Sequence, residues 1–187
     1  MTRKQINAEF SEEQVLKKCF DCLVVLGLER ASMRDFCEVT GLSTSSLYHR
    51  FENKDEIVIK AACLGLSNVT KELFWVASTK LANSKELSNA VIKNVDLRKN
   101  RVRLIYQIAT SPKYGDLFRE KTLHIADIYM IYAEMIAKHL KCSPNVLIPY
   151  VYLFVATVRE YIIWEDKTKT ELELNTIYSD VMKRIAH

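Results

Sequence analysis

Residues 32–51, S-M-R-D-F-C-E-V-T-G-L-S-T-S-S-L-Y-H-R-F, carry the periodicity of two short helices joined by a tight turn. In the first half, Met33 and Phe36 stand at i and i+3, the spacing of an apolar face on a helix. Gly41 can adopt the left-handed backbone that ends a helix, and Ser43 is a good N-cap for the next one. This segment is therefore predicted to form a helix-turn-helix.

The second of these helices is polar, and no acidic residue occurs between Val39 and Phe51. Leu47 and Phe51 are four residues apart and would form its buried face. The opposite face carries hydroxyl, phenol and basic side chains, which suit phosphate oxygens and base edges. Such a helix can enter the major groove of DNA.

Two basic residues flank this helix. Lys54 would open the next helix, where the helix dipole disfavours a cation unless it faces a phosphate, and Arg34 lies early in the preceding helix. Two structural alternatives stay open: Tyr48 as a partly buried core residue, and the hydroxyl residues as helix caps. The predicted DNA-binding residues are Arg34, Ser43, Thr44, Ser45, Ser46, Tyr48, His49, Arg50 and Lys54.

This segment resembles the DNA-binding signature of the TetR family of bacterial transcription regulators. The matching residues are Ser32, Gly41-Leu42-Ser43, Leu47-Tyr48-His49-Arg50-Phe51 and Lys54-Asp55-Glu56. In one departure, the chain has Ser45 where the family often has Gly. The resemblance implies a repressor that binds a palindromic operator in double-stranded DNA as a homodimer and is released by a small-molecule effector. It also implies that Lys54 contacts a phosphate.

Composition favours an all-α protein. Only 4 Gly and 3 Pro occur among 187 residues, and 49% of the residues are hydrophobic, enough for a sizeable core. We predict about nine helices: an N-terminal three-helix head, a long connecting helix and a C-terminal helical bundle. Residues 1–53 are predicted to form the DNA-binding domain, and residues 54–187 the domain for ligand binding and dimerisation.

Three helices are predicted in the middle of the chain. Residues 84–97 and 99–110 are read as two helices, Pro112 and Gly115 are expected to break the chain, and one long helix is expected to follow them to about Leu140.

A single recognition helix makes too small an interface for tight specific binding, so a dimer is expected. The two C-terminal helices carry more apolar surface than a small body can bury alone, and the TetR family pairs its last two helices across a two-fold axis. The predicted dimer-interface residues are Val151, Val155, Val158, Ile162, Ile177, Val181 and Ile185. A role in the core of the single chain is the alternative.

The same family usually encloses a small-molecule pocket in the C-terminal body. Aromatic side chains that could line such a pocket are Trp75, Tyr106, Phe118, Tyr129, Tyr132 and Tyr152, with a plain core role as the alternative. The basic residues between Arg98 and Arg103 either form a solvated face or favour an anionic ligand.

The five cysteines are scattered, and the N-terminus has no apolar signal segment, so reduced thiols and a cytoplasmic location are expected. Cys19 and Cys22 form a C-x-x-C motif on the interior face of a predicted helix. Packed thiols are predicted there, with a redox or zinc site as the alternative. We expect no metal or cofactor.

Several function classes are excluded by pattern. The chain has no phosphate-binding loop, dinucleotide fingerprint or nucleophile elbow, so no enzyme is predicted. The longest apolar run, residues 146–158, is too short to cross a bilayer. Residues 1–60 hold nine Lys/Arg and ten Asp/Glu, so DNA binding must depend on local placement of charge. The alternative function is a helical protein-interaction module that uses the helix-turn-helix only for packing.

Overall fold

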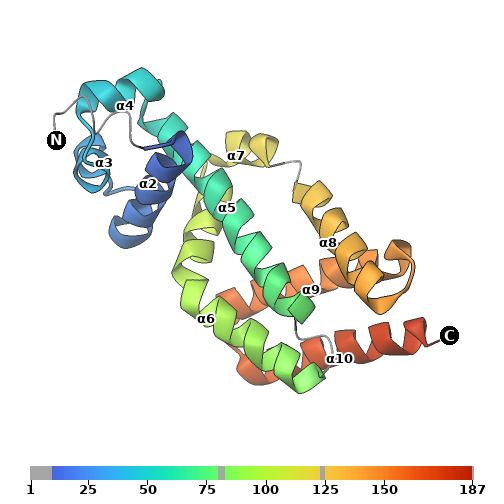
Figure 1. The fold of residues 1–187 in the computed structure, drawn as a ribbon. Coiled ribbons are helices and arrows are strands. Elements are labelled where there is room, and N and C mark those ends of the chain that lie inside the picture. The colour runs from blue at the N-terminus through green and yellow to red at the C-terminus, as the bar shows by residue number, and fades with distance from the viewer. Residues whose placement is uncertain (1–9, 80–82, 123–124, 187) are drawn as a thin grey trace. The chain divides into compact units, whose positions relative to one another are not determined.

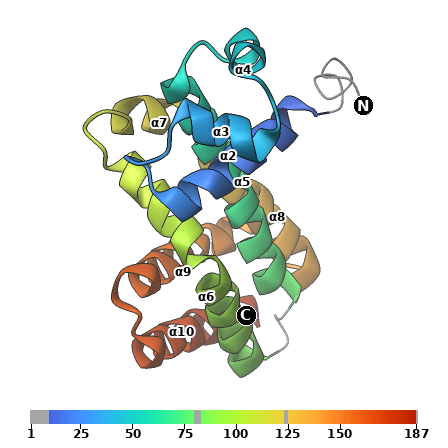
Figure 2. The ribbon, with the colours of Figure 1, turned by 90° about the vertical axis from the view of Figure 1, so that its left-hand side faces the viewer.

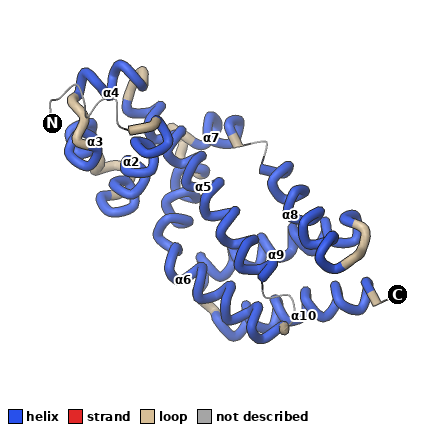
Figure 3. The backbone as a smooth tube through the Cα atoms, in the orientation of Figure 1, coloured by secondary structure: helices blue, strands red, loops and turns tan. Residues whose placement is uncertain are grey.

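The computed structural model describes residues 10–79, 83–122 and 125–186. For residues 125 and 126 it describes only the backbone. Within these ranges the chain forms nine helices and no strand (Figure 1). Figure 3 shows that loops join the helices throughout the described part of the chain. The helices are α2 (Glu12–Leu26), α3 (Met33–Thr40), α4 (Thr44–Arg50), α5 (Lys54–Thr79), α6 (Ser84–Ala109), α7 (Gly115–Lys121), α8 (Ile125–Leu140), α9 (Pro144–Trp164) and α10 (Lys167–Ile185).

The chain divides into two compact units that do not follow the sequence order. The first unit comprises residues up to Val69 together with Asn100–Thr122, and the second comprises Thr70–Lys99 and the residues from position 123 onward. Helices α5 and α6 therefore each contribute to both units. The predicted boundary after residue 53 falls inside the first unit, at the start of α5. The assignment of DNA binding to one side of this boundary, and of ligand binding and dimerisation to the other, stays a prediction.

Hydroxyl caps set the helix starts in the first unit. The Ser11 Oγ accepts a hydrogen bond from the Gln14 N–H at 3.2 Å, and the Gln14 side chain in turn accepts one from the Ser11 N–H at 2.8 Å. This reciprocal pair satisfies two amide groups that the first turn of α2 leaves without partners. Ser32 begins α3 by the same pairing with Asp35, so both helices start at a capping box.

The turn between α3 and α4 is closed by a glycine and a buried threonine. Gly41 has φ +73°, in the left-handed region that favours glycine. The buried Thr40 Oγ1 donates to the Phe36 carbonyl at 2.6 Å and accepts from the Leu42 N–H at 3.3 Å. Sequence reasoning missed this threonine. It holds Leu42 in the corner between the helices, where Leu42 is buried.

A continuous core lies under the helix-turn-helix. Phe36, Leu47 and Phe51 are almost fully buried and pack with Ile57 and Val58 of α5. The C-terminal part of α6 and helix α7 complete this core through further apolar side chains, namely Leu104, Ile105, Ile108, Tyr114 and Phe118.

Gly65 lets two helices of the first unit approach closely. A Cβ built at this position would lie 2.5 Å from Cζ of Phe20, whose ring is buried. The lack of a side chain at Gly65 is what admits the Phe20 ring against α5.

In the second unit, α8 and α10 both pack on α9. The Phe74 ring stacks on the Tyr132 ring at a centroid distance of 4.3 Å and contacts the Phe154 ring at 5.7 Å. The buried Tyr161 hydroxyl donates to Asp96 Oδ1 at 2.7 Å, which fixes α9 against α6. Burial, together with this hydrogen bond, raises the pKa of Tyr161.

Two boundary predictions are wrong. Residues 84–109 form one helix, because no Pro or Gly interrupts them and the Arg98 guanidinium donates to the Asn94 carbonyl within the same helix. The long helix predicted to follow Pro112 and Gly115 and to reach about Leu140 is instead divided into α7 and α8. Thr122 ends α7, since its Oγ1 donates to the Phe118 carbonyl at 2.8 Å.

Among the described helices, α9 alone is long and apolar enough to cross a membrane by length and composition. The sequence argument from a short apolar run is therefore wrong for the helix as a whole, which continues to Trp164. Eight of its residues are nevertheless buried. The helix packs against α8 and α10 of the second unit.

The cysteines are free thiols, and Cys19 and Cys22 lie in the core of the first unit. Burial raises the pKa of the Cys19 thiol to about 12. A thiol held protonated in this way is a poor nucleophile and a poor metal ligand, which agrees with the packed-thiol prediction.

Candidate nucleic-acid interface

Helix α4 lies at the edge of the first unit (Figure 2). Its residues are polar apart from the buried Leu47 and the exposed Tyr48. Ser43 is its N-cap, and the Ser43 Oγ accepts from the Ser46 N–H at 3.2 Å. Leu47 turns fully into the core, which leaves the opposite side of the seven-residue helix outward. The predicted division into a buried and an exposed face is confirmed.

The predicted DNA-binding residues differ in their exposure to solvent. Arg34, Thr44, Ser45, Tyr48 and His49 are exposed, and the Tyr48 side chain is 51% accessible. Ser43, Ser46, Arg50 and Lys54 are only partly exposed. Tyr48 is therefore not a core residue of this chain.

Some of these side chains already have partners. The Thr44 Oγ1 lies 3.4 Å from the Cys37 Sγ, and the Ser43 Oγ lies 2.8 Å from the Ser46 Oγ. The capping alternative is thus correct for Ser43, whose hydroxyl serves the start of α4.

Arg50, one of the predicted DNA-binding residues, is engaged within the first unit. Its Nη1 donates to the Phe10 carbonyl at 2.8 Å, across 40 positions of sequence. This bond ties the segment that precedes α2 to the end of α4. Arg50 therefore has a structural task, and its contact with DNA stays a prediction.

Asp55, in the first turn of α5, ties that helix to the segment before α7. Its Oδ1 accepts from Lys113 Nζ at 2.7 Å and from the Tyr114 hydroxyl at 2.8 Å. The Lys113 hydrogen bond, with that of Tyr114, holds the pKa of the Asp55 carboxyl below its usual value. Because Lys54 is the neighbouring residue, this contact fixes the helix end that carries Lys54. The sequence offered no signal for a partner 59 residues away.

Solved structures with this arrangement of helices are transcriptional regulators. A Mesorhizobium loti MAFF303099 protein assigned to the TetR family matches with a TM-score of 0.60 and 12% identity, over 98% of this chain and 98% of that one. A Shewanella sp. PV-4 protein assigned to the same family matches with a TM-score of 0.51 and 13% identity, over 97% and 96% of the two chains. A transcriptional regulator from Rhodococcus sp. Rha1 gives a TM-score of 0.54 and 18% identity, over 92% and 97%.

The fold is that of the TetR family. A shorter sequence match joins the chain to the HTH-type transcriptional regulator PksA of Bacillus subtilis (strain 168), with 26% identity over 100 residues. That match covers 54% of this chain and about half, 49%, of the relative's length. No protein-family model matches the chain.

Within this TetR-family fold, the predicted dimer residues are mostly turned inward. Val151, Val158 and Ile162 are buried in the single chain, so the core alternative is correct for these three. The other four, Val155, Ile177, Val181 and Ile185, are partly buried. Sequence periodicity identified the apolar side of each helix but could not tell the core face from an interface.

Other apolar side chains of α9 and α10 do reach the surface. The most accessible are Trp164, at 72%, and Leu172, at 67%, while Leu153 and Ile163 are more than half exposed. Sequence reasoning missed these four, because their neighbours in sequence look equally apolar.

The six aromatic residues predicted to line a pocket are not all brought together, although the Phe74 ring contacts both the Tyr129 and the Tyr132 rings. Tyr106 and Phe118 belong to the first unit. Trp75 is 66% exposed, and the Tyr129 ring packs against the Tyr152 ring edge-on at 5.7 Å. Tyr132 stacks on Phe74 in the core. None of the six lines the apolar cavity of the second unit, so this prediction is wrong for that cavity.

The basic residues near position 100 are paired with acids rather than gathered into an anion site. Arg98 pairs with Glu72, Lys99 Nζ lies 2.9 Å from Glu165 Oε2, and Arg101 Nη2 lies 2.9 Å from Asp21 Oδ1. Such exposed pairs contribute little stability but neutralise the local charge. These contacts agree with the interpretation that the basic residues between Arg98 and Arg103 form a solvated face.

Proposed function

We propose that this chain is a transcription repressor that binds palindromic double-stranded DNA as a homodimer. It is not an enzyme, and it works in the cytoplasm. A small-molecule effector held in the second unit releases it from the operator.

The exposed polar face of α4 carries the proposal. Thr44, Ser45 and Tyr48 are accessible, and Leu47 fixes the orientation of the helix from behind. Hydroxyl and phenol groups on such a face can bond to phosphates and base edges in the major groove. The likeness to solved transcriptional regulators supports this use of the fold.

The exposed apolar residues of α9 and α10 support a dimer. Ile163, Trp164 and Leu172 would lose contact with water if the same helices of a second subunit packed against them. A dimer would place two copies of α4 in successive major grooves, about 34–36 Å apart.

The test begins with selection of bound duplexes from a random library, followed by titration of the selected duplex at several salt concentrations. Palindromic half-sites are expected, with affinity that falls steeply as salt rises. Lys54→Ala should reduce the salt slope by about 1.8, because each lost phosphate contact contributes about 0.9 and a dimer loses two. Lys71→Ala changes an exposed lysine further along α5 and serves as the matched control.

Two further variants separate positioning from specificity. Tyr48→Phe removes one hydroxyl, and it should weaken binding to all duplexes about equally. Thr44→Ala should instead change which duplexes are selected. An unchanged salt slope in Lys54→Ala would refute the phosphate role of that residue. Absent or salt-insensitive duplex binding would favour the protein-interaction module.

A further inference from the structure

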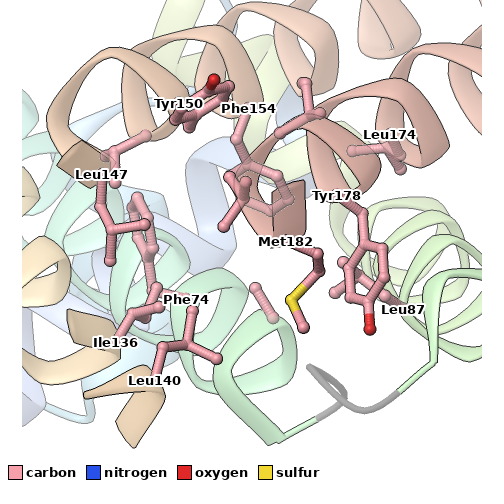
Figure 4. A pocket seen from close by; sticks show the side chains of 14 residues that line it. Phe74, Leu87, Ile136, Leu140, Leu147, Tyr150, Phe154, Leu174, Tyr178 and Met182 are labelled. Carbon is pink, nitrogen blue, oxygen red and sulfur yellow. The ribbon is translucent and has the colours of Figure 1, made fainter. Parts of the chain in front are cut away.

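The second unit contains an apolar cavity bounded by α5, α6, α8, α9 and α10, with a volume of about 80 Å³. Figure 4 shows Phe74, Ile136 and Leu140 on one side of it, with Leu87 and Tyr178 on the other. The cavity lies among well-packed side chains, since Phe74, Leu147 and Leu174 are all buried. It is therefore a defined space within the unit.

The lining offers nothing to a charged ligand. Among the described residues that form it, none is charged, and the only side-chain oxygens are the phenol groups of Tyr150 and Tyr178. In Figure 4 the Tyr150 hydroxyl points away from the other labelled side chains. Arg184 lies over the Tyr150 ring at 5.8 Å but does not line the cavity. A carboxylate or ammonium group placed inside would lose its hydration without compensation.

The volume limits the length of an occupant. A water-sized group needs about 10–15 Å³ of such space, so the cavity holds roughly five to eight of them. A methylene group is similar in size to a water molecule, so the space corresponds to a short hydrocarbon chain.

We infer that this cavity binds an uncharged alkyl group of about five to eight carbons, carried by a molecule with a neutral polar end. The contacts are made by aliphatic and aromatic carbon, with Met182 as an adaptable wall at the C-terminal end. The use of this site for effector control rests on the proposed function, whereas binding of the alkyl group does not.

The test is calorimetric titration of the full chain, without DNA, with straight-chain primary alcohols from butanol to decanol. Affinity should rise about fourfold for each added methylene, because each one buries a further apolar group. The rise should stop near eight carbons. Octanoate should bind at least about tenfold more weakly than octanol, because its carboxylate finds no partner.

Three results would overturn the inference. One is the absence of saturable binding, and another is an affinity that keeps rising through decanol, as expected for nonspecific partition. The third is octanoate binding as tightly as octanol. Because DNA is absent from the titration, failure of operator binding would leave these results unaffected, and the two failures are distinguishable.

Variants locate the binding site. Ala77→Leu fills the cavity from α5 and should abolish alcohol binding, with thermal unfolding as the check on folding. Met182→Ala removes side-chain atoms at a partly exposed position and should move the optimum to chains longer by about two carbons. Lys183→Ala, an exposed position also on α10 but outside the cavity, is the matched control and should leave binding unchanged. If the affinity of Met182→Ala for the alcohols depends on chain length in the same way as that of the control, the assignment of the binding site to this cavity fails.

Discussion

Replacement of Gly65 by alanine tests the close approach of α2 and α5. The new methyl group would lie 2.5–2.7 Å from three atoms of the Phe20 ring, about 1 Å inside the usual 3.5–4.0 Å carbon contact. Overpacking of this kind costs about 1–3 kcal/mol. Alanine also improves helix propensity by about 1 kcal/mol over glycine. The net expectation is a destabilisation of up to about 2 kcal/mol.

The cause can be isolated by a second change. In a Phe20→Leu background the ring is absent, so Gly65→Ala should become stabilising by up to about 1 kcal/mol, the propensity gain alone. Urea unfolding of the four proteins, followed by circular dichroism, gives the coupling free energy directly. A stabilising effect of Gly65→Ala that is the same in both backgrounds would refute the steric argument. Equal destabilisation in both backgrounds would do so too.

Further expectations concern the head of the molecule. Ser43→Ala should cost about 1 kcal/mol of stability through loss of the α4 cap, measured by thermal unfolding. Ser43→Asp should retain the cap but abolish duplex binding, measured by DNA titration, because it places a negative charge beside the phosphates. Gly41→Ala should destabilise by about 1–2 kcal/mol, because φ is +73° and no atom lies within 4 Å of the new Cβ, and Gly41→Asn should cost less in the same unfolding assay. Asp55→Asn should lower stability by less than about 1 kcal/mol at neutral pH, since the pair is exposed. The pKa of Asp55 is depressed by its partners, so this stability difference should be constant above pH 3.8, the ordinary value, and vanish as the pH falls below it; a difference that grows in acid would contradict the assigned contact.

The sequence was most informative where the physical cause is local. A serine hydroxyl three residues before an amide, or a glycine after an apolar stripe, acts within one helical turn. For this reason Gly41 ends α3 and Ser43 begins α4 where predicted. The buried pair Leu47 and Phe51 follows from the same local periodicity, and it determined which face of α4 is exposed.

The errors arise where the cause is distant in sequence. An apolar stripe on α9 shows that one side is buried but cannot show against what, so Val151 and Val158 were assigned to a dimer surface although both lie in the core. The cavity was missed for the same reason, because it needs side chains from five helices at once. The tie between Asp55 and Tyr114 likewise depends on tertiary structure.

The discontinuous first unit restricts how this protein could be rebuilt. A chimera that takes only residues 1–53 would leave behind Ile57 and Val58 on α5, as well as Leu104 and Ile108 on α6, which belong to the same core. In the chimera, the apolar side chains of residues 1–53 that pack against these four residues would face water. Evolution by recombination meets the same obstacle, so this head is expected to be inherited with its α5 and α6 segments and not as a detachable cassette.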